Sequence, residues 1–304
     1  MIVLGIETTA HTFGASIIDT EQKEYDKILS NVKEMATTEE GGMIPSKVAD
    51  HHEELFDTVL GSAFTQAKKT WADIELLAVS QAPGMGHALR VGVAVARTLA
   101  LRHNKPLVGV NHCSAHLEVA SMVTDATDPI LLYCSGANTQ IIAYEAGQYR
   151  IFGETLDTGI GNFLDTFARD MGLGFPGGPK VEQLARDYSG DELLEIPYSV
   201  KGMDVAFSGI LTNLNKKIKS GEFAKEQLAH TTQEVVFAML VEVAERAIAH
   251  SGKKELVLGG GVACNKRLQE MCQLMCDARD VKLYIPQNQL LVDNAAMIAW
   301  CGYL

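Results

Sequence analysis

Gly109-Val-Asn-His-Cys-Ser-Ala-His-Leu-Glu118 is the stretch on which the fold of this chain turns. A short apolar strand over residues 107–110 runs into Asn111, where a helical pattern begins with His112 and His116 four residues apart. On a helix this spacing places both imidazoles on one face, one turn apart. Two imidazoles there can bind one metal ion, although a polar pair at the start of a core helix has the same pattern.

Length and composition predict the class of protein. With 304 residues we expect two domains or one bilobed unit. The apolar fraction of 47% is that of a globular protein, no window has the roughly 18 uncharged apolar residues of a membrane span, and the first residues do not resemble a signal peptide. Six scattered cysteines predict reduced thiols. We therefore expect a cytoplasmic protein with no membrane partner.

The formal net charge of -12 limits the kinds of partner. Proteins that bind nucleic acid by themselves usually present a basic face, so strong autonomous binding is not expected. A local patch or basic partner proteins remain open. Lys216, Lys217 and Lys219 form the best basic cluster, and such a run is more often a solvated helix face.

A hairpin pattern occurs twice. Residues 2–6 and 13–18 read as strands around a polar turn, and residues 130–134 and 139–144 read as strands around Ser135-Gly-Ala-Asn138. This repeat predicts two lobes of similar fold that face each other across a cleft. We expect the first lobe at residues 1–128, with residues 288–304 packing back near its metal site, and the second lobe at residues 129–287.

Strand, glycine loop and helix follow one another at residues 74–101 and again at residues 256–276, which is typical of α/β units. No Gly-x-Gly-x-x-Gly and no Walker lysine accompanies them, so neither a Rossmann dinucleotide site nor a P-loop is indicated. A loop is expected at residues 41–45, followed by a helix capped by Ser46, with His51 and His52 in solvent or at an interface. Asp293 can be a simple cap of the closing helix.

Taken together, these motifs resemble those of the tRNA threonylcarbamoyl-transferase family, the universal proteins formerly named glycoproteases. The matching stretches run in order along nearly the whole chain and are Gly5-Ile-Glu-Thr-Thr9, Asn111-His-Cys-Ser-Ala-His-Leu-Glu118, Tyr133-Cys-Ser-Gly-Ala-Asn-Thr-Gln140, Gly153-Glu-Thr-Leu-Asp-Thr-Gly159, Gly161-Asn-Phe-Leu-Asp-Thr-Phe-Ala-Arg169, Pro176-Gly-Gly-Pro-Lys-Val-Glu182, Phe207-Ser-Gly209, Gly260-Gly-Val-Ala-Cys-Asn265 and Asp293-Asn-Ala-Ala-Met-Ile-Ala299.

The resemblance implies an α/β fold of the actin/Hsp70/sugar-kinase (ASKHA) type, with two related lobes around a nucleotide cleft. It implies one divalent metal, iron or zinc, held by His112, His116, Tyr133 and Asp293, and this mixed nitrogen and oxygen set does not choose between the two. A Mg²⁺ ion accompanying the nucleotide is a further option.

The ligand site implied by the resemblance takes an adenine nucleotide, threonylcarbamoyl-AMP. In it, Asp165 and Glu182 accept from ribose hydroxyls, Gly178 allows close approach, and Asn265 lies near the base. The phosphate and acyl part is lined by Tyr133, Cys134, Ser135, Gly136 and Ala137. Ala137 departs from the family, which usually has a second glycine there, so its Cβ can crowd a phosphate or change the turn.

The implied reaction transfers the threonylcarbamoyl group to N6 of the adenosine 3′ of the anticodon in tRNAs that read ANN codons, and releases AMP. No residue is an obvious general base, and Glu7 and Glu118 are weak candidates. Cys113-Ser-Ala115 between the histidines and Lys201-Gly-Met-Asp-Val-Ala-Phe-Ser208 look similar to the archaeal and eukaryotic branch of the family. This resemblance implies a KEOPS-like complex with a small atypical protein kinase. Because the chain ends earlier than expected, we expect a trimmed chain or one fused to that kinase downstream.

Two alternatives have different tests. A metallopeptidase is suggested by His-x-x-x-His, but Cys113 stands where zincins have their catalytic glutamate. An ASKHA ATPase acting as a nucleotide-gated interaction protein would share the fold, and it predicts ATP turnover without transfer to tRNA.

Overall fold

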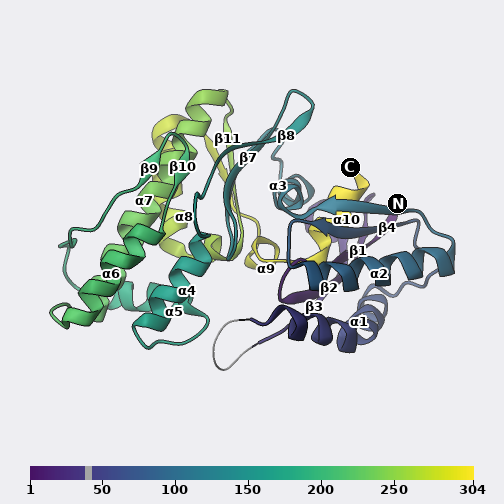
Figure 1. The fold of residues 1–304 in the computed structure, drawn as a ribbon. Coiled ribbons are helices and arrows are strands. Elements are labelled where there is room, and N and C mark those ends of the chain that lie inside the picture. The colour runs from purple at the N-terminus through teal and green to yellow at the C-terminus, as the bar shows by residue number, and fades with distance from the viewer. Residues whose placement is uncertain (38–42) are drawn as a thin grey trace. The chain divides into compact units, whose positions relative to one another are not determined.

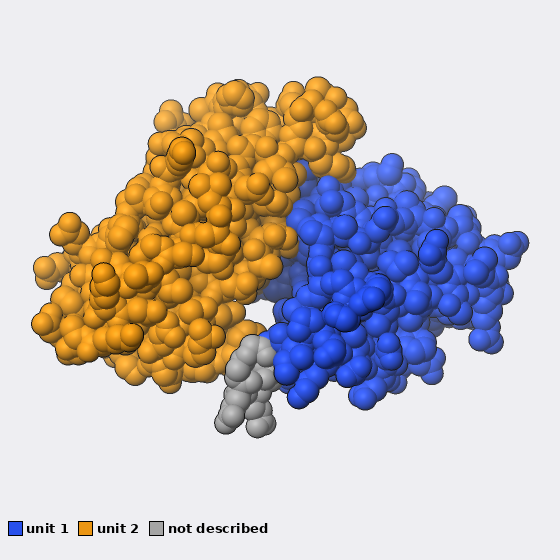
Figure 2. All heavy atoms as spheres, viewed as in Figure 1, with its two compact units in different colours: residues 1–125, 286–304 blue, residues 126–285 orange. Residues whose placement is uncertain are grey.

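The computed structural model describes residues 1–37 and 43–304, and these form two compact units (Figure 2). Unit 1 contains residues 1–125 and 286–304, and unit 2 contains residues 126–285. Residues 41 and 42 of the predicted loop lie outside the described residues. None of the helices in the described part of the chain is long and apolar enough to cross a bilayer.

Unit 1 is built on a five-stranded sheet in the order β3-β2-β1-β4-β5. Strands β1, β2 and β3 are antiparallel, whereas β4 and β5 run parallel to β1. The strands are β1 (Ile2–Glu7), β2 (Thr12–Asp19), β3 (Ile28–Met35), β4 (Leu76–Ala82) and β5 (Leu107–Asn111). The sheet therefore begins with the predicted hairpin and continues with parallel α/β connections.

Helices cover both faces of this sheet (Figure 1). On one face, Leu4 and Ile6 pack with Leu60 of α1 and Ala96 of α2. On the other face, Val3 packs with residues of α3 and α10. Neighbouring residues of β1 face opposite sides, as the pleat of a strand requires. The helices are α1 (Pro45–Ala67), α2 (Gly86–His103), α3 (His112–Val123), α9 (Asn288–Leu291) and α10 (Ala295–Tyr303), with a 3-10 turn at Glu24–Lys27.

Unit 2 has a second sheet with the same topology, in the order β12-β11-β6-β7-β8. Strands β6, β7 and β8 are antiparallel, and β11 and β12 run parallel to β6. Each strand of unit 1 thus has a counterpart, so the predicted internal repeat is confirmed. The strands are β6 (Ile130–Cys134), β7 (Thr139–Glu145), β8 (Gln148–Glu154), β11 (Glu255–Gly259) and β12 (Lys282–Tyr284).

The helices of unit 2 include α7, a long helix whose buried residues pack on β6, β7 and β8. A small hairpin of β9 (Val200–Lys201) and β10 (Asp204–Val205) was absent from the sequence-based interpretation, because two-residue strands leave no periodic pattern. The helices are α4 (Ile160–Asp170), α5 (Gly177–Asp187), α6 (Ser208–Ser220), α7 (Lys225–Ser251) and α8 (Lys266–Arg279), with a 3-10 turn at Gly261–Cys264.

Two predictions about α1 were wrong. Its cap is Ile44, with Pro45 in the first helical position, so Ser46 lies inside the helix and does not cap it. His52 is fully buried, where its Nε2 lies 3.0 Å from the carbonyl oxygen of Ala10. That hydrogen bond compensates for the loss of water, which explains why a histidine expected in solvent lies in the core.

Candidate functional site

The start of helix α3 fixes two histidines. The Asn111 side chain accepts hydrogen bonds from the backbone N–H groups of Cys113 and Ser114, at 3.0 and 3.1 Å, and so caps the helix. The helix therefore begins at His112, and His116 follows one turn later. Their rings are both buried and lie edge to face, with centroids 4.8 Å apart.

Asp293, the residue before the cap of α10, approaches these rings. The cap of α10 is Asn294, whose Oδ1 accepts from the N–H of Met297 at 3.0 Å, so the hypothesis that Asp293 is a simple cap is wrong. The Asp293 carboxylate instead faces the histidines. Its Oδ1 lies 3.3 Å from His112 Nε2 and 3.6 Å from His116 Nε2.

The spacing of these three atoms fits a metal ion. All three ligand atoms lie within 4.8 Å of one another. Bonds of about 2.0 to 2.2 Å in tetrahedral or octahedral geometry separate neighbouring ligand atoms by about 2.8 to 3.6 Å. The two nitrogen-to-oxygen distances fall in this range, so His112, His116 and Asp293 can hold one ion together.

The electrostatics of the cluster favour the protonation states that bind a metal. Burial alone would raise the pKa of Asp293, but the charges and hydrogen bonds of His112 and His116 outweigh it and hold that pKa well below its usual range. Burial lowers the pKa of His116, and the nearby Asp293 opposes this only in part. A divalent cation would displace the hydrogens that the rings share with Asp293 and leave an ionised carboxylate beside neutral imidazoles.

Glu7 lies behind His112 at the end of β1 and is fully buried. Its Oε2 lies 3.0 Å from His112 Nδ1, on the opposite side of the ring from Asp293. Its Oε1 accepts from the backbone N–H of Thr9 at 2.6 Å. Both oxygens are therefore engaged within the site, which argues against the suggestion that Glu7 acts as a general base.

Tyr133, the fourth metal ligand implied by the resemblance, is buried at the end of β6 in unit 2. The three ligands that the structure brings together all belong to unit 1. The contribution of Tyr133 to the metal therefore stays a prediction.

In unit 2, Asp165 and Gly178 come together at the start of α5. The Asp165 Oδ1 accepts the backbone N–H of Gly177 at 2.7 Å, which ties α4 to this helix. A Cβ built on Gly178 would meet no atom within 4 Å, so the backbone there borders open space. A ligand can approach the helix closely at this point, next to a carboxylate.

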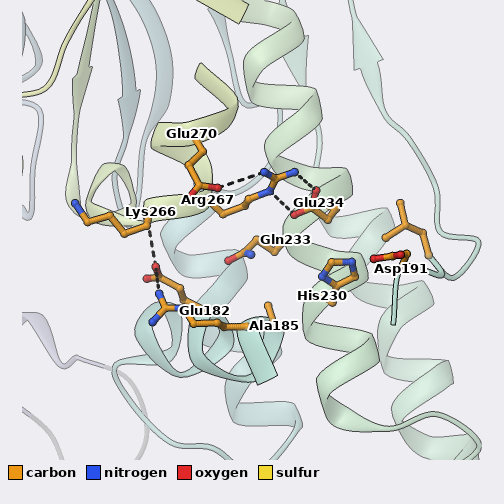
Figure 3. A pocket seen from close by; sticks show the side chains of 11 residues that line it. Glu182, Ala185, Asp191, His230, Gln233, Glu234, Lys266, Arg267 and Glu270 are labelled. Carbon is orange, nitrogen blue, oxygen red and sulfur yellow. Dashed lines mark hydrogen bonds and ion pairs between the residues drawn. The ribbon is translucent and has the colours of Figure 1, made fainter. Parts of the chain in front are cut away.

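The side chains of Glu182, from α5, and Asn265 both contact the start of α8 in the same unit. The Glu182 Oε1 accepts the backbone N–H of Lys266 at 3.1 Å. The Asn265 side chain caps α8 through Oδ1 and donates through Nδ2 to Gln233 Oε1 at 3.0 Å. Glu182, Gln233 and Lys266 line a cavity of about 460 Å³ (Figure 3), a volume within the usual range for small-molecule sites.

The turn between β6 and β7 is held by backbone contacts with the first turn of α4 and with the loop at Gly260. Ser135 and Gly136 accept the N–H groups of Gly161 and Asn162, each at 3.0 Å. Gly260 has a φ of +88°, and a Cβ there would lie 2.3 Å from the Cys134 carbonyl oxygen, so only glycine fits. The Cys134 side chain is buried and burial raises the pKa of its thiol, so Cys134 can line a ligand only with its backbone.

Comparison with known proteins assigns this arrangement to a family. Residues 27–300 match the sequence profile described as tRNA N6-adenosine threonylcarbamoyltransferase. The chain belongs to this family. A protein of that name from Thermococcus sibiricus is 54% identical over 302 residues, which cover 99% of this chain and 91% of the relative. The predicted membership is therefore confirmed, and the chain is a transferase of this family.

A longer relative has a second part. A Methanocaldococcus jannaschii protein, named a probable bifunctional tRNA threonylcarbamoyladenosine biosynthesis protein, is 47% identical over 304 residues. The match covers 100% of this chain and 55% of that relative. The names of these relatives describe transfer or tRNA modification, and they favour neither the peptidase nor the ATPase alternative.

Solved structures of distant sequence confirm the ASKHA-type fold of this transferase. A full-length HypF structure superposes with a TM-score of 0.66 at 13% identity, covering 99% of this chain and 55% of that one. Component A of the Acidaminococcus fermentans (R)-2-hydroxyglutaryl-CoA dehydratase superposes with a TM-score of 0.59 at 13% identity, covering 100% and 98%.

Two residues of these sites were not singled out from the sequence as working groups. Thr9 holds the Glu7 carboxylate, and Gln233 holds the Asn265 side chain. Thr9 had a signal, since it belongs to the first motif shared with the family, whereas Gln233 lies within a long amphipathic helix that offers no pattern to mark it.

Proposed function

We propose that this transferase moves the threonylcarbamoyl group from threonylcarbamoyl-AMP to N6 of the adenosine 3′ of the anticodon in tRNAs that read ANN codons. N6 attacks the carbamoyl carbon, a carbon–nitrogen bond forms, the carbon–oxygen bond to the phosphate breaks, and AMP leaves while N6 loses a proton. The observation that carries the proposal is the convergence of His112, His116 and Asp293 in a chain of this family.

We assign the reaction's metal to these three residues, with Tyr133 as the fourth ligand. A divalent iron or zinc ion bound there would supply a Lewis acid for the oxygens of the transferred group. The protein's own contribution is to fix the ligands before the substrate arrives, because two of them lie on one helix turn and the third directly precedes a helix cap. Orientation matters most here, since an exocyclic amine is a poor nucleophile.

We assign the adenylate moiety to unit 2. Asp165 and Glu182 would accept from the ribose hydroxyls, the open space at Gly178 would admit the sugar, and Asn265 would lie beside the base. The exposed turn at Gly136 and Ala137 would face the phosphate, with a Mg²⁺ ion as a further option. Support comes from the half-buried carboxylates at two helix starts and from the nearby cavity.

We further propose that tRNA binding is shared with partner proteins in a KEOPS-like complex that includes a small atypical protein kinase, either separate or fused. The net charge of -12 makes a strong tRNA contact by this chain alone unfavourable. Lys216 and Lys219 are exposed on α6, whereas Lys217 packs over the ring of Phe223 at 5.0 Å. We place the protein in the cytoplasm, because the described cysteines form no disulfide.

The test is transfer of labelled threonylcarbamoyl from its adenylate to unmodified tRNA, with and without candidate partner proteins. We expect the wild type to label tRNA, and a His112→Ala/His116→Ala double variant to lose the label. If tRNA is not labelled in the presence of any partner while ATP is hydrolysed, the transferase proposal is wrong and the ATPase alternative is supported.

A further inference from the structure

The contact between Glu7 and His112 determines which ring nitrogen of His112 carries its hydrogen. The Nδ1 atom has two oxygen neighbours, Glu7 Oε2 at 3.0 Å and Thr9 Oγ1 at 3.1 Å. The Glu7 carboxylate accepts the N–H and the hydroxyl of Thr9 at Oε1, and Oε2 offers a further acceptor to His112. The Thr9 hydroxyl has one hydrogen, and it points to Glu7 Oε1 at 2.5 Å. Neither neighbour therefore has a hydrogen to give, so the hydrogen must be on Nδ1.

With a hydrogen held on Nδ1, Nε2 is the nitrogen whose lone pair becomes available to a metal once it releases the hydrogen that it shares with Asp293. That atom faces Asp293 Oδ1 at 3.3 Å, on the side where His116 Nε2 also approaches. The lone pair is thus directed at the place where the proposed metal would bind. If Nε2 instead carried the only ring hydrogen, His112 would be removed from the ligand set.

We propose that Glu7 is a positioning residue that fixes the tautomer and the ring orientation of His112, and that Thr9 in turn fixes Glu7. The inference rests on the metal site of the proposed function and extends it to two residues that do not touch the metal. Glu7 is well suited to this task because it is fully buried at the end of a central strand. Its Oε1 accepts a hydrogen bond from Thr9, and its Oε2 faces His112 Nδ1.

The geometry predicts what an amide would do in place of this carboxylate. The backbone N–H of Thr9 lies 2.6 Å from Glu7 Oε1, and a backbone N–H can only donate. In Glu7→Gln the amide oxygen must therefore stay at the Oε1 site, and the amide NH₂ must face His112 Nδ1. A donor there requires a lone pair on Nδ1, which moves the ring hydrogen to Nε2. An almost isosteric change would thus block the metal-binding nitrogen.

The first measurement is Zn²⁺ affinity of the metal-stripped full-length chain, by competition with a chelator. We expect Glu7→Gln to weaken binding by about 10- to 100-fold, the usual range for loss of such a supporting carboxylate. Thr9→Val removes the hydroxyl but keeps the backbone N–H, so a smaller loss is expected, and Thr9→Ser should rescue it. Glu54→Gln, an exposed change on α1 with the same loss of charge, should have no effect.

The second measurement distinguishes positioning from simple core packing. In protein with ¹⁵N-labelled histidine, NMR reports which ring nitrogen carries the hydrogen, and the His112 signal is identified by its loss in His112→Asn. We expect Nδ1 to carry a hydrogen in the metal-free wild type and in Thr9→Ser, whereas in Glu7→Gln only Nε2 should carry one. Neither measurement needs tRNA, so a failed transfer assay would leave this result standing.

Two outcomes would overturn the proposal. One is a folded Glu7→Gln protein that binds Zn²⁺ as tightly as the wild type. The other is weaker binding while His112 keeps its hydrogen on Nδ1, which would mean that Glu7 only supports the core. If Glu7→Gln does not fold, Thr9→Val decides, and wild-type affinity in that variant refutes the proposal.

Discussion

The two candidate sites of this transferase use polar side chains in opposite ways. In unit 1, His112 and His116 are buried and turn their Nε2 atoms toward one carboxylate oxygen. In unit 2, Asp165 and Glu182 are half-buried and accept backbone N–H groups at helix starts. The first arrangement is preorganised to bind a cation, whereas the second holds helix ends together beside open space.

This difference teaches how each site should respond to mutation. A cluster of facing side chains has a single geometry, so the loss of one group leaves the others wrongly matched. Acceptors at helix starts are supported by the backbone and can be replaced with a smaller loss. We therefore expect large, selective effects in unit 1 and graded effects in unit 2.

The largest effect is expected at Asp293. Asp293→Asn removes the charge that faces two imidazoles and should weaken both metal affinity and transfer by about 100-fold or more, as removal of a first ligand does. The adjacent Asn294→Ala is the matched control, since it keeps all three ligands but removes the α10 cap and the hydrogen bonds from Nδ2 to the Leu290 and Val292 carbonyl oxygens. It should cost about 1 to 2 kcal/mol of stability for the cap and about 1 to 3 kcal/mol more for the two buried carbonyl groups. Chelator competition and thermal unfolding separate the two, and equal metal affinities would contradict the comparison.

His52 tests whether burial by itself makes a histidine a ligand in unit 1. Burial is the main cause that lowers the pKa of His52 to about 4, and the nearby His51 and His11 add to it. The hydrogen bond to the Ala10 carbonyl and the charge of Glu7 act in the opposite direction and raise this pKa. The unfolded state therefore binds more protons between pH 6.5 and pH 4, and stability falls as the pH drops through that window.

We expect the free energy of unfolding to decrease by about 2 kcal/mol from this group between pH 7 and pH 4. His52→Gln should flatten this dependence. Denaturant unfolding at several pH values provides the measurement. Weaker Zn²⁺ binding in His52→Gln would show that His52 belongs to the metal site after all.

Unit 2 should show a moderate effect at Glu182. Glu182→Gln keeps an acceptor for the Lys266 N–H but weakens a charged acceptor for ribose, so nucleotide affinity should fall by about 10-fold. Zn²⁺ affinity should stay unchanged, because the three facing ligands belong to unit 1. Calorimetry with AMP and with Zn²⁺ measures both affinities on one protein. A loss of both affinities in Glu182→Gln would contradict the assignment of the metal ligands to unit 1 and of the nucleotide to unit 2.

The smallest effect is expected at Ala137. This residue is exposed and is not among the described residues with positive φ, so its Cβ strains neither the core nor the backbone. Ala137→Gly should change AMP affinity by less than about 3-fold, with a slight loss of stability from added chain freedom. A gain of 10-fold or more would mean that this Cβ crowds the phosphate.

Local patterns predicted much of this fold. The repeated hairpin at residues 2–18 and 130–144 indicated two related sheets, and both have the same strand order. His112 and His116 were placed together by helical spacing. What local patterns could not supply was the contact with Asp293, because it joins residues far apart in the chain. Asp and Asn are equally favoured as residue types at a helix N-cap, so the sequence does not distinguish Asp293 from Asn294. Only the structure shows that Asn294 caps α10.

Buried polar groups were the main source of error. His52 looks like a surface residue until the Ala10 carbonyl is placed beside its Nε2. Thr9 and Gln233 act through hydrogen bonds to other side chains, and no periodicity marks such contacts. Residues whose task is to hold another residue are therefore the part of a site that sequence patterns miss.

The measurement that tests the central claim most directly is transfer to tRNA by metal-stripped protein to which metal is added back. The wild type should lose transfer on stripping and regain it with Fe²⁺ or Zn²⁺, whereas His112→Ala/His116→Ala should stay inactive at every metal concentration, with the same partner proteins present. Full transfer by the stripped wild type, or by the double variant, would contradict the assignment of this cluster to the reaction.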